Sequence, residues 1–419
     1  MMLLRHTGIR KPNLLLFLVW GIWLFCLLFS RKWHILGPVS FRNFAGMIIV
    51  PVAMFMSCRT ILTNTIKIYL LWNFYYIIIN SLNGYDVFLT NNYIAYNIIS
   101  FCIIYAIPKL VKDIRTLDII IIWFVVFYIL NSCLTIFQFF NNSIAWEITN
   151  YIAPISESEM LQYSYYENEE SLLSQSLCSG LNGFVVANGR FIAGFLPIAT
   201  FLIWHKNKRE VFAGICIMCL GLISAFCTQQ RMCFLLVILF ILYFLYSRLN
   251  IGLKIVLFMM GLFIVVFFAD MLLLDSSNYG RLLSADSNGR SQTLEMTDMY
   301  FTNWDYFLRG NMAGDSYSHK MLMTMGHNCF LDALRRGGII SFALYTYMFF
   351  EVTFELKNVI ISSKKNSNYF AACFAMSSLL VLLYSFTHSE NIMGGSIFFW
   401  LSYSLMHACL RKEAMSPQN

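Results

Sequence analysis

Short polar segments interrupt an otherwise apolar sequence, and they carry the side chains whose types suit chemistry. These residues are Arg190, Arg231, Arg290, His327, Asn328, His388 and Glu390. A guanidinium binds oxyanions through a planar fork of N–H donors. An imidazole near neutral pH can accept the proton of a hydroxyl group or orient it. The set therefore predicts a site that binds an anionic group and activates an alcohol.

Arg231 ends the segment Thr228-Gln229-Gln230-Arg231, a polar interruption between two apolar runs. Such a turn must lie at or slightly below a membrane surface, where an arginine costs a few kcal/mol unless it is paired or solvated. Snorkelling of the side chain to lipid headgroups would explain a lone arginine there. The polar Thr and Gln neighbours favour a binding site, because a simple anchor does not need them.

Arg290 and His327 stand at expected helix starts. Arg290 follows Ser287-Asn288-Gly289, where free backbone N–H groups make a cation unfavourable unless an anion binds there. A solvated loop arginine is the alternative. His327 and Asn328 open a later apolar run, and a histidine in this place serves either as a general base or only as a helix cap.

Two further polar groups have similar alternatives. His388 and Glu390 lie two residues apart in a short hairpin between apolar runs, which fits either a hydrogen-bonded pair or a solvated turn. Arg190 follows Asn188-Gly189 at the expected entry of a helix. It fits either a binding site or an anchor at the membrane interface.

Composition places these residues in a membrane protein. The 419-residue chain is 58% apolar and only 12% charged, which excludes an ordinary soluble or disordered protein. The formal net charge is +7, but the basic residues lie scattered between apolar runs, which argues against a nucleic-acid surface. The cysteines lie mostly in or beside apolar runs, and only Cys178 and Cys329 suit an oxidising compartment.

Long apolar runs set the expected architecture, because a spanning helix needs about 20 mostly apolar residues. Roughly twelve runs qualify. They are approximately 13–30, 37–57, 61–80, 92–111, 117–140, 188–204, 211–227, 232–246, 252–274, 334–356, 369–386 and 392–410. The sequence thus predicts an all-α polytopic membrane protein with about twelve transmembrane helices in one domain, residues 1–419. The first run lacks a signal cleavage site, so we expect it to be retained.

Lysine and arginine residues in the short loops predict the orientation. The basic segments are the amino terminus, 109–115, 206–209, 248–254, 357–365 and Arg411-Lys412. Their alternation places both termini in the cytoplasm. One loop does not fit this orientation, because it would lie on the outer side of the membrane although it contains Arg31, Lys32 and Arg42.

Two long segments then lie on the outer side. Residues 141–187 contain six glutamates and no Lys or Arg, and residues 275–333 connect helices nine and ten. Loops of this length are usually functional. We expect the second loop to contain an amphipathic helix from about Ser291 to Leu308, broken by Gly310 and Gly314.

The predicted orientation brings all the candidate side chains to one outer face, beside lipid. Arginine, histidine and glutamate in this position suit a lipid-linked diphosphate, whose oxygens guanidinium groups bind and whose departing charge they stabilise. The sequence has no HExxH, no paired CxxC motifs, no Walker A loop and no GxSxG. This pattern favours a mechanism without a metal or another cofactor.

Several short motifs resemble the O-antigen ligase and O-antigen polymerase superfamily. They are Thr228-Gln229-Gln230-Arg231, Gly289-Arg290, residues 307–314, residues 326–334 and Gly337-Gly338, and together they cover roughly residues 188–356. The resemblance implies a metal-independent glycosyltransferase of the bacterial inner membrane that works on the periplasmic face. Its partners would be membrane lipid and oligosaccharide linked to undecaprenyl diphosphate, and a separate chain-length regulator is a compatible further partner.

The resemblance also implies roles for individual residues. Arg231 and Arg290 match the arginines that hold the donor diphosphate, and His327 matches the histidine beside the acceptor hydroxyl. Four residues are expected to bind substrate around this catalytic group. They are Arg190, Asn328, His388 and Glu390.

Three activities remain open at this level. A composition rich in Phe, Tyr, Ile and Asn, together with the His388 hairpin, favours the polymerase, which passes the growing glycan to a lipid-linked repeat. The alternative is the ligase, which passes the glycan to lipid A core. A flippase for the same lipid is less favoured, because it would place charges near the membrane midplane and have short outer loops.

Overall fold

The computed structural model describes most of the chain as helices. The described residues are 14–29, 33–36, 39–56, 62–83, 92–111, 113–140, 147, 151, 178–182, 185–204, 207–228, 230–248, 301–310, 328–366, 368–387, 393 and 395–415. The α-helices are α1 (Leu14–Phe29), α2 (Phe41–Met54), α3 (Asn64–Leu82), α4 (Asn92–Leu110), α5 (Ile114–Phe140), α9 (Val185–Ala199), α10 (Lys208–Cys227), α11 (Arg231–Arg248), α14 (Trp304–Arg309), α16 (Cys329–Lys365), α17 (Tyr369–Tyr384) and α18 (Ile397–Met415). Short 3-10 helices are η1 (Gly180–Asn182), η2 (Phe201–Trp204) and η4 (Ser385–Thr387), and β1 (His34–Leu36) pairs antiparallel with β2 (Val39–Ser40).

Polar side chains define where several helices begin. A side-chain oxygen at the helix start accepts hydrogen bonds from backbone N–H groups that have no partner within the helix. The capping residues are Ser40 for α2, Thr63 for α3, Asn207 for α10, Asn328 for α16 and Asn368 for α17. Between these caps the helices are almost wholly apolar, and four segments are long and apolar enough to cross a membrane: Ile114–Phe140, Val186–Trp204, Lys208–Cys227 and Cys329–Lys365. The architecture is therefore compatible with a helical membrane protein.

The predicted apolar runs coincide with helices wherever the structure describes them, and the run at 252–274 lies outside the described residues. Two expectations need correction. The run at 334–356 is the middle of α16, a kinked helix of 37 residues that begins five residues earlier. Of the amphipathic helix expected from Ser291 to Leu308, residues 291–300 lie outside the described residues, and the part from 301 on is interrupted at Asn303, whose extended backbone and side-chain cap start the separate short helix α14.

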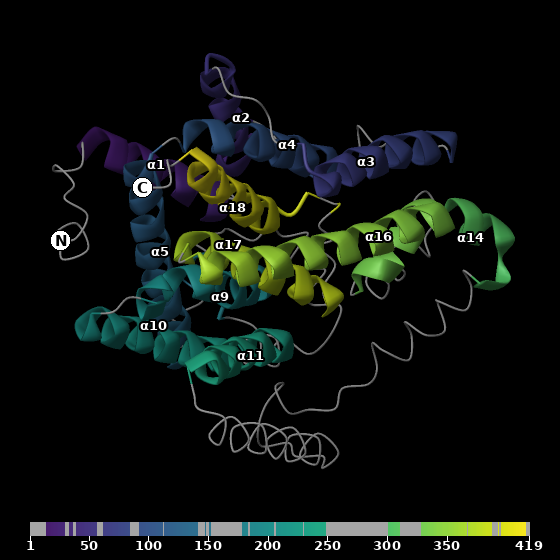
Figure 1. Cartoon of the computed structure of the whole chain (residues 1–419). Coiled ribbons are helices and arrows are strands. Elements are labelled where there is room, and N and C mark those ends of the chain that lie inside the picture. The colour runs from purple at the N-terminus through teal and green to yellow at the C-terminus, as the bar shows by residue number, and fades with distance from the viewer. Residues whose placement is uncertain are drawn as a thin grey trace, which may run out of the picture.

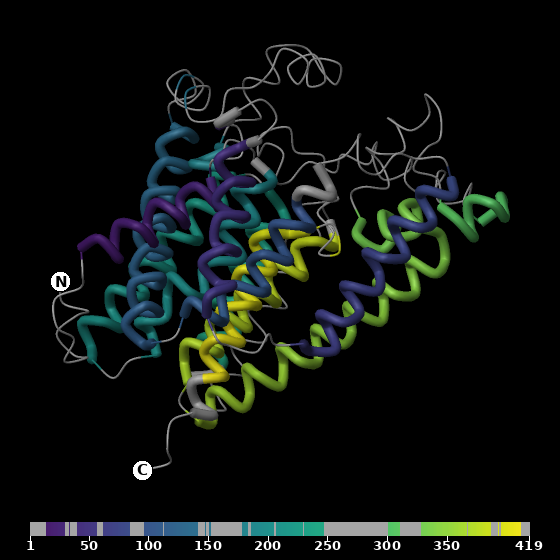
Figure 2. Tube along the Cα trace, turned by 90° about the horizontal axis from the view of Figure 1, so that it is seen from above, coloured from purple at the N-terminus to yellow at the C-terminus, as the bar shows by residue number. Residues whose placement is uncertain are grey.

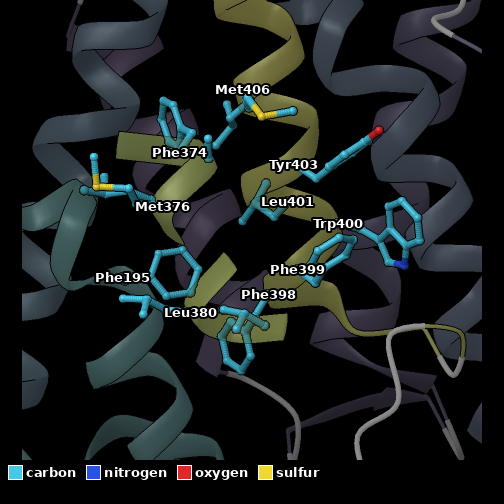
Figure 3. Packing of buried hydrophobic residues seen from close by; sticks show 14 of the residues in the cluster. Phe195, Phe374, Met376, Leu380, Phe398, Phe399, Trp400, Leu401, Tyr403 and Met406 are labelled. Atoms are coloured by element: carbon cyan, nitrogen blue, oxygen red, sulfur yellow. The ribbon is translucent and has the colours of Figure 1, made fainter. Parts of the chain in front are cut away.

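The helices form layers, with α17 in the middle (Figure 1). The α17 helix contacts α9 on one side and α16 and α18 on others, and nearly all of its side chains are buried. Figure 3 shows this core, in which Phe195 of α9 meets Phe398 of α18 with ring centroids 5.6 Å apart. Small residues let α9 and α17 approach closely, since a Cβ on Gly194 would lie only 2.5 Å from Cγ2 of Val381.

The α16 helix bends where it meets α14. Gly338 has φ 68° and ψ −161°, and Gly310 at the end of α14 has φ 76° and ψ 179°, a region of backbone conformation that is essentially limited to glycine. The missing side chains let the two backbones touch, because a Cβ on Gly310 would lie 2.5 Å from the carbonyl oxygen of Arg335. Gly310 therefore ends α14, as the sequence predicts, and also docks it on α16.

The α3 helix holds this junction from the other side, and it runs beside α16 toward α14 (Figure 2). Asn80 Nδ2 donates to the Arg336 carbonyl at 2.8 Å, and the Tyr75 hydroxyl donates to the Gly337 carbonyl at 2.8 Å. Asn83 Nδ2 donates to the carbonyl of Arg309 in α14 at 3.2 Å. Side chains of α3 thus donate hydrogen bonds to backbone carbonyl groups at the kink, and these bonds stabilise the bent form of α16.

We expect Gly338→Ala to lower the free energy of unfolding by more than about 2 kcal/mol, because the residue has a glycine-only conformation and its new Cβ would overlap the Leu308 backbone. Gly337→Ala is the matched control. Gly337 has an extended φ of −161°, and its Cβ would meet side-chain atoms of Ser341 and Tyr75, so the loss should be smaller. Thermal unfolding of both purified variants in detergent measures this, and equal midpoints for Gly338→Ala and wild type would contradict it.

Candidate functional site

Arg190 lies within α9, in its second turn, rather than at the entry that the sequence suggests. Its side chain is only 1% exposed and is one of the largest fully buried side chains in the described part of the chain. A residue that anchors a helix at the membrane interface would expose its head group. The burial removes the interface-anchor explanation, and it places a permanent positive charge inside the helix bundle.

A hydrogen-bonded network fixes the start of α9 next to Arg190. Asn188 accepts from Asn131 Nδ2 of α5 at 2.7 Å, and it donates to Thr135 Oγ1 at 3.0 Å and to the Cys178 carbonyl at 2.5 Å. Gln138 of α5 accepts from the backbone N–H of Gly180 in η1 at 2.8 Å. These buried amides join α5, η1 and α9 at one end of the bundle, so the position of Arg190 along its helix axis is well defined.

The turn between α10 and α11 carries the second candidate arginine. Thr228 caps the end of α10, and its Oγ1 donates to the Ala225 carbonyl at 2.7 Å and accepts from the backbone N–H of Gln230 at 3.3 Å. Arg231 is the first residue of α11 and is half-buried. The polar segment therefore forms a tight turn between two apolar helices, as its sequence predicts.

Tyr384, the last residue of α17, connects the two arginine-bearing elements. Its hydroxyl donates to Gln230 Oε1 at 3.3 Å, and its ring centroid lies 5.6 Å from Cζ of Arg190. Gly189 makes room for this arrangement, since a Cβ there would lie 2.6 Å from the Tyr384 hydroxyl oxygen. The end of α17 is thus a common surface for α9 and the start of α11.

The start of α16 reaches the same end of α17. Asn328 is its N-cap, and Asn328 Oδ1 accepts from the backbone N–H groups of Phe330 and Leu331 at 2.9 and 3.2 Å. The Phe330 ring packs on Phe386 of η4, which continues α17, at a centroid distance of 5.4 Å. Capping gives the Asn328 oxygen a structural role, which is a different use from the expected binding of substrate.

A buried ion-pair group stabilises the same turn of α16. The Asp332 carboxylate forms two ion pairs. Its Oδ1 accepts from Arg335 Nη2 at 2.7 Å, and its Oδ2 accepts from Arg336 Nε at 2.6 Å. Asp332 is almost completely buried. The carboxylate also lies in the first turn, where the helix dipole favours a negative charge. These contacts tie the start of α16 to the kink at Gly337.

Three predicted positions therefore approach one another through α17. Arg190, the Gln230-Arg231 turn and the start of α16 at Asn328 all lie around the segment Tyr384–Phe386. Arg231 directly follows Gln230 in the chain, and a guanidinium group is a side chain that can neutralise an oxyanion. Among the described residues, no group of three or more His, Cys, Asp or Glu side chains is placed to hold a metal ion.

The other candidate residues are not described. Arg290, His327, His388 and Glu390 all lie outside the described residues, and so does most of both long loops, 141–187 and 275–333. His327 directly precedes Asn328 in the chain, and His388 directly follows Thr387, the last residue of η4. Their predicted roles stay predictions.

No protein-family model matches this sequence, and no curated protein is significantly similar to it.

A second polar cluster, which sequence reasoning missed, joins α3, α16 and α18. Glu355 Oε2 accepts from Thr65 Oγ1 at 2.7 Å and from the Tyr403 hydroxyl at 2.8 Å, and Oε1 lies 3.1 Å from His407 Nε2. Thr63 exchanges a further hydrogen bond with Tyr403 at 2.8 Å. The sequence did contain a signal for this cluster, because a glutamate and a histidine lie inside apolar runs. Each of these two side chains needs a polar partner when it is buried. Both oxygens of the carboxylate are engaged, so the cluster fastens the three helices together.

Cys178 and Cys329 are both free thiols and both buried, so no bridge joins them. Burial raises the pKa of Cys178, which lies between α5 and α9, to about 12. The thiolate is the reactive form of cysteine, and a raised pKa keeps the thiol protonated near neutral pH. Cys178 is therefore a structural residue.

We expect a maleimide to leave Cys178 unmodified in the folded protein at any pH between about 7 and 9, because its thiol stays protonated until the pH approaches the raised pKa. Peptide mass spectrometry after labelling measures this, and labelling in denaturing detergent is the control that the reagent reaches every cysteine. Modification of Cys178 in the folded protein that rises with pH as it does for an exposed thiol would contradict the assignment.

Proposed function

We propose that this protein is an O-antigen polymerase, a glycosyltransferase that extends a glycan held on undecaprenyl diphosphate. The resemblance of its motifs to the ligase and polymerase superfamily names the activity. The observation that carries the proposal is the burial of Arg190 beside Tyr384, at the point where the Gln230-Arg231 turn also arrives. A guanidinium held beside an aromatic ring, with a second arginine in the adjoining turn, suits recognition of the oxygens of a diphosphate.

The membrane arrangement that goes with this function has about twelve spans, both termini in the cytoplasm and the site at the periplasmic surface of the inner membrane. Support comes from the apolar helices and from the alternation of basic loops along the sequence. The turn at Arg231 and the start of α16 then fall on the outer side.

The chemistry exchanges one bond to the donor sugar for another. The acceptor hydroxyl forms a bond to the anomeric carbon, and the bond from that carbon to the diphosphate oxygen breaks. Arg231 and Arg290, with Arg190, neutralise the departing undecaprenyl diphosphate, and His327 takes or positions the proton of the acceptor hydroxyl. The acceptor is a lipid-linked repeat, so the glycan grows by one repeat at each transfer.

The proposal predicts that Arg231→Ala lowers the rate of chain extension by about 10²–10³, because the variant removes one preorganised charge from the leaving group. The assay incubates purified protein in detergent with lipid-linked repeats and resolves the products by length. Arg209→Ala is the matched control, since Arg209 is an exposed arginine in the first turn of α10 and should leave the rate unchanged.

The same assay separates the alternatives. Extended lipid-linked glycan identifies a polymerase, whereas transfer only to added lipid A core identifies a ligase. A protein that extends nothing in detergent but moves the lipid across a vesicle membrane is a flippase. Full-rate extension by Arg231→Ala would refute the role given to this arginine.

A further inference from the structure

The side chain of Tyr384 touches two elements that are far apart in the sequence. Its ring lies 5.6 Å from the Arg190 guanidinium carbon, within the range of a cation–π contact, and its hydroxyl donates to Gln230 at 3.3 Å. Both contacts come from a residue that is fully buried at the end of α17. Any movement of α9 against the start of α11 must therefore disturb Tyr384.

The contact between Arg190 and the Tyr384 ring is a contact with the ring alone. A guanidinium that meets an aromatic ring does so through the ring's π face, and this uses none of its five N–H donors. Those donors are the groups that recognise oxyanions in pairs. Tyr384 can thus hold the guanidinium group of Arg190 in place without using the N–H donors that bind an oxyanion.

Gln230 is held on both its backbone and its side chain. Its N–H donates to Thr228 Oγ1 at 3.3 Å, its carbonyl accepts from Phe234 at 3.0 Å in the first turn of α11, and its side-chain oxygen accepts from Tyr384. Arg231 is the next residue. The hydrogen bond from Tyr384 therefore helps to fix the backbone position of Arg231.

Gly189 shows that this arrangement depends on close approach. A Cβ at this position would lie 2.6 Å from the Tyr384 hydroxyl oxygen and 3.4 Å from Cγ of Gln230. Only a residue without a side chain leaves space for the tyrosine and the glutamine to meet beside α9. The pair is therefore packed against the helix that carries Arg190.

We infer that Tyr384 and Gln230 are positioning residues that hold Arg190 and Arg231 at one diphosphate-binding surface. The inference rests on the proposed function and adds to it a device that joins the two arginines. Tyr384 acts through its neighbours and needs no contact with the substrate. The ligand class is a lipid diphosphate, as in the proposed function.

The test measures binding of undecaprenyl diphosphate to the full-length protein in nanodiscs, with undecaprenol as the uncharged comparison. We expect Tyr384→Phe and Gln230→Ala each to weaken binding of the diphosphate by about three- to tenfold, the value of one neutral hydrogen bond. Both substitutions remove the same hydrogen bond. The double variant should therefore bind the diphosphate about as tightly as the single variant with the lower affinity.

Tyr128→Phe is the matched control. Tyr128 is also buried, and its hydroxyl also donates to a residue of α9, the Ile192 carbonyl, at 3.2 Å. Its loss should lower the thermal unfolding midpoint to a similar extent as Tyr384→Phe and leave diphosphate binding unchanged. Equal weakening by Tyr128→Phe would show a general packing effect and overturn the inference.

The outcomes separate the two claims. Wild-type protein that binds undecaprenyl diphosphate no better than undecaprenol would overturn both the proposed function and the inference. Wild-type protein that prefers the diphosphate, with Tyr384→Phe and Gln230→Ala equal to it, would leave the function standing and overturn the positioning role. Additive losses in the double variant would also overturn it, since they would mean that the two residues act separately.

Discussion

Close packing of α9 against α17 is the contact on which the rest of this arrangement depends. Lipid tails are as apolar as the helix surfaces, so helices in a membrane associate through fit rather than through the hydrophobic effect. Gly189 and Gly194 provide that fit, because side chains there would overlap Tyr384 and Val381. The same approach brings Arg190 within reach of an aromatic ring at the end of α17.

The polar groups of the bundle then fall into two kinds. Amides such as Asn188 and the carboxylate of Glu355 are surrounded by short hydrogen bonds that join neighbouring helices, so their role is structural. Arg190 of α9 and the turn that carries Arg231 instead meet the end of α17, and η4, which continues α17, packs on the start of α16. The proposed function is built on the second kind.

Much of the helical framework follows from the sequence, because length and apolarity decide whether a segment can cross a membrane. The turn at Thr228–Arg231 and the end of α14 at Gly310 follow from local chemistry too. The burial of Arg190 does not, since it depends on α9 packing against α5 and α17, which lie far from it in the sequence. The Tyr384–Gln230 hydrogen bond joins residues 154 positions apart, so it appears only once the helices have packed.

The burial of α9 has a consequence for how the chain is assembled. Nearly all residues of the segment Val186–Trp204, which covers most of α9 and all of η2, are buried inside the protein. Synthesis proceeds from the amino end, and α9 leaves the ribosome before α16, α17 and α18 exist. A newly made α9 carries Asn188 and Arg190 near its start, and such polar residues make the insertion of an isolated helix less favourable. Because α9 packs against α17 in the folded protein, the burial of α9 is complete only after the carboxyl-terminal helices have been made.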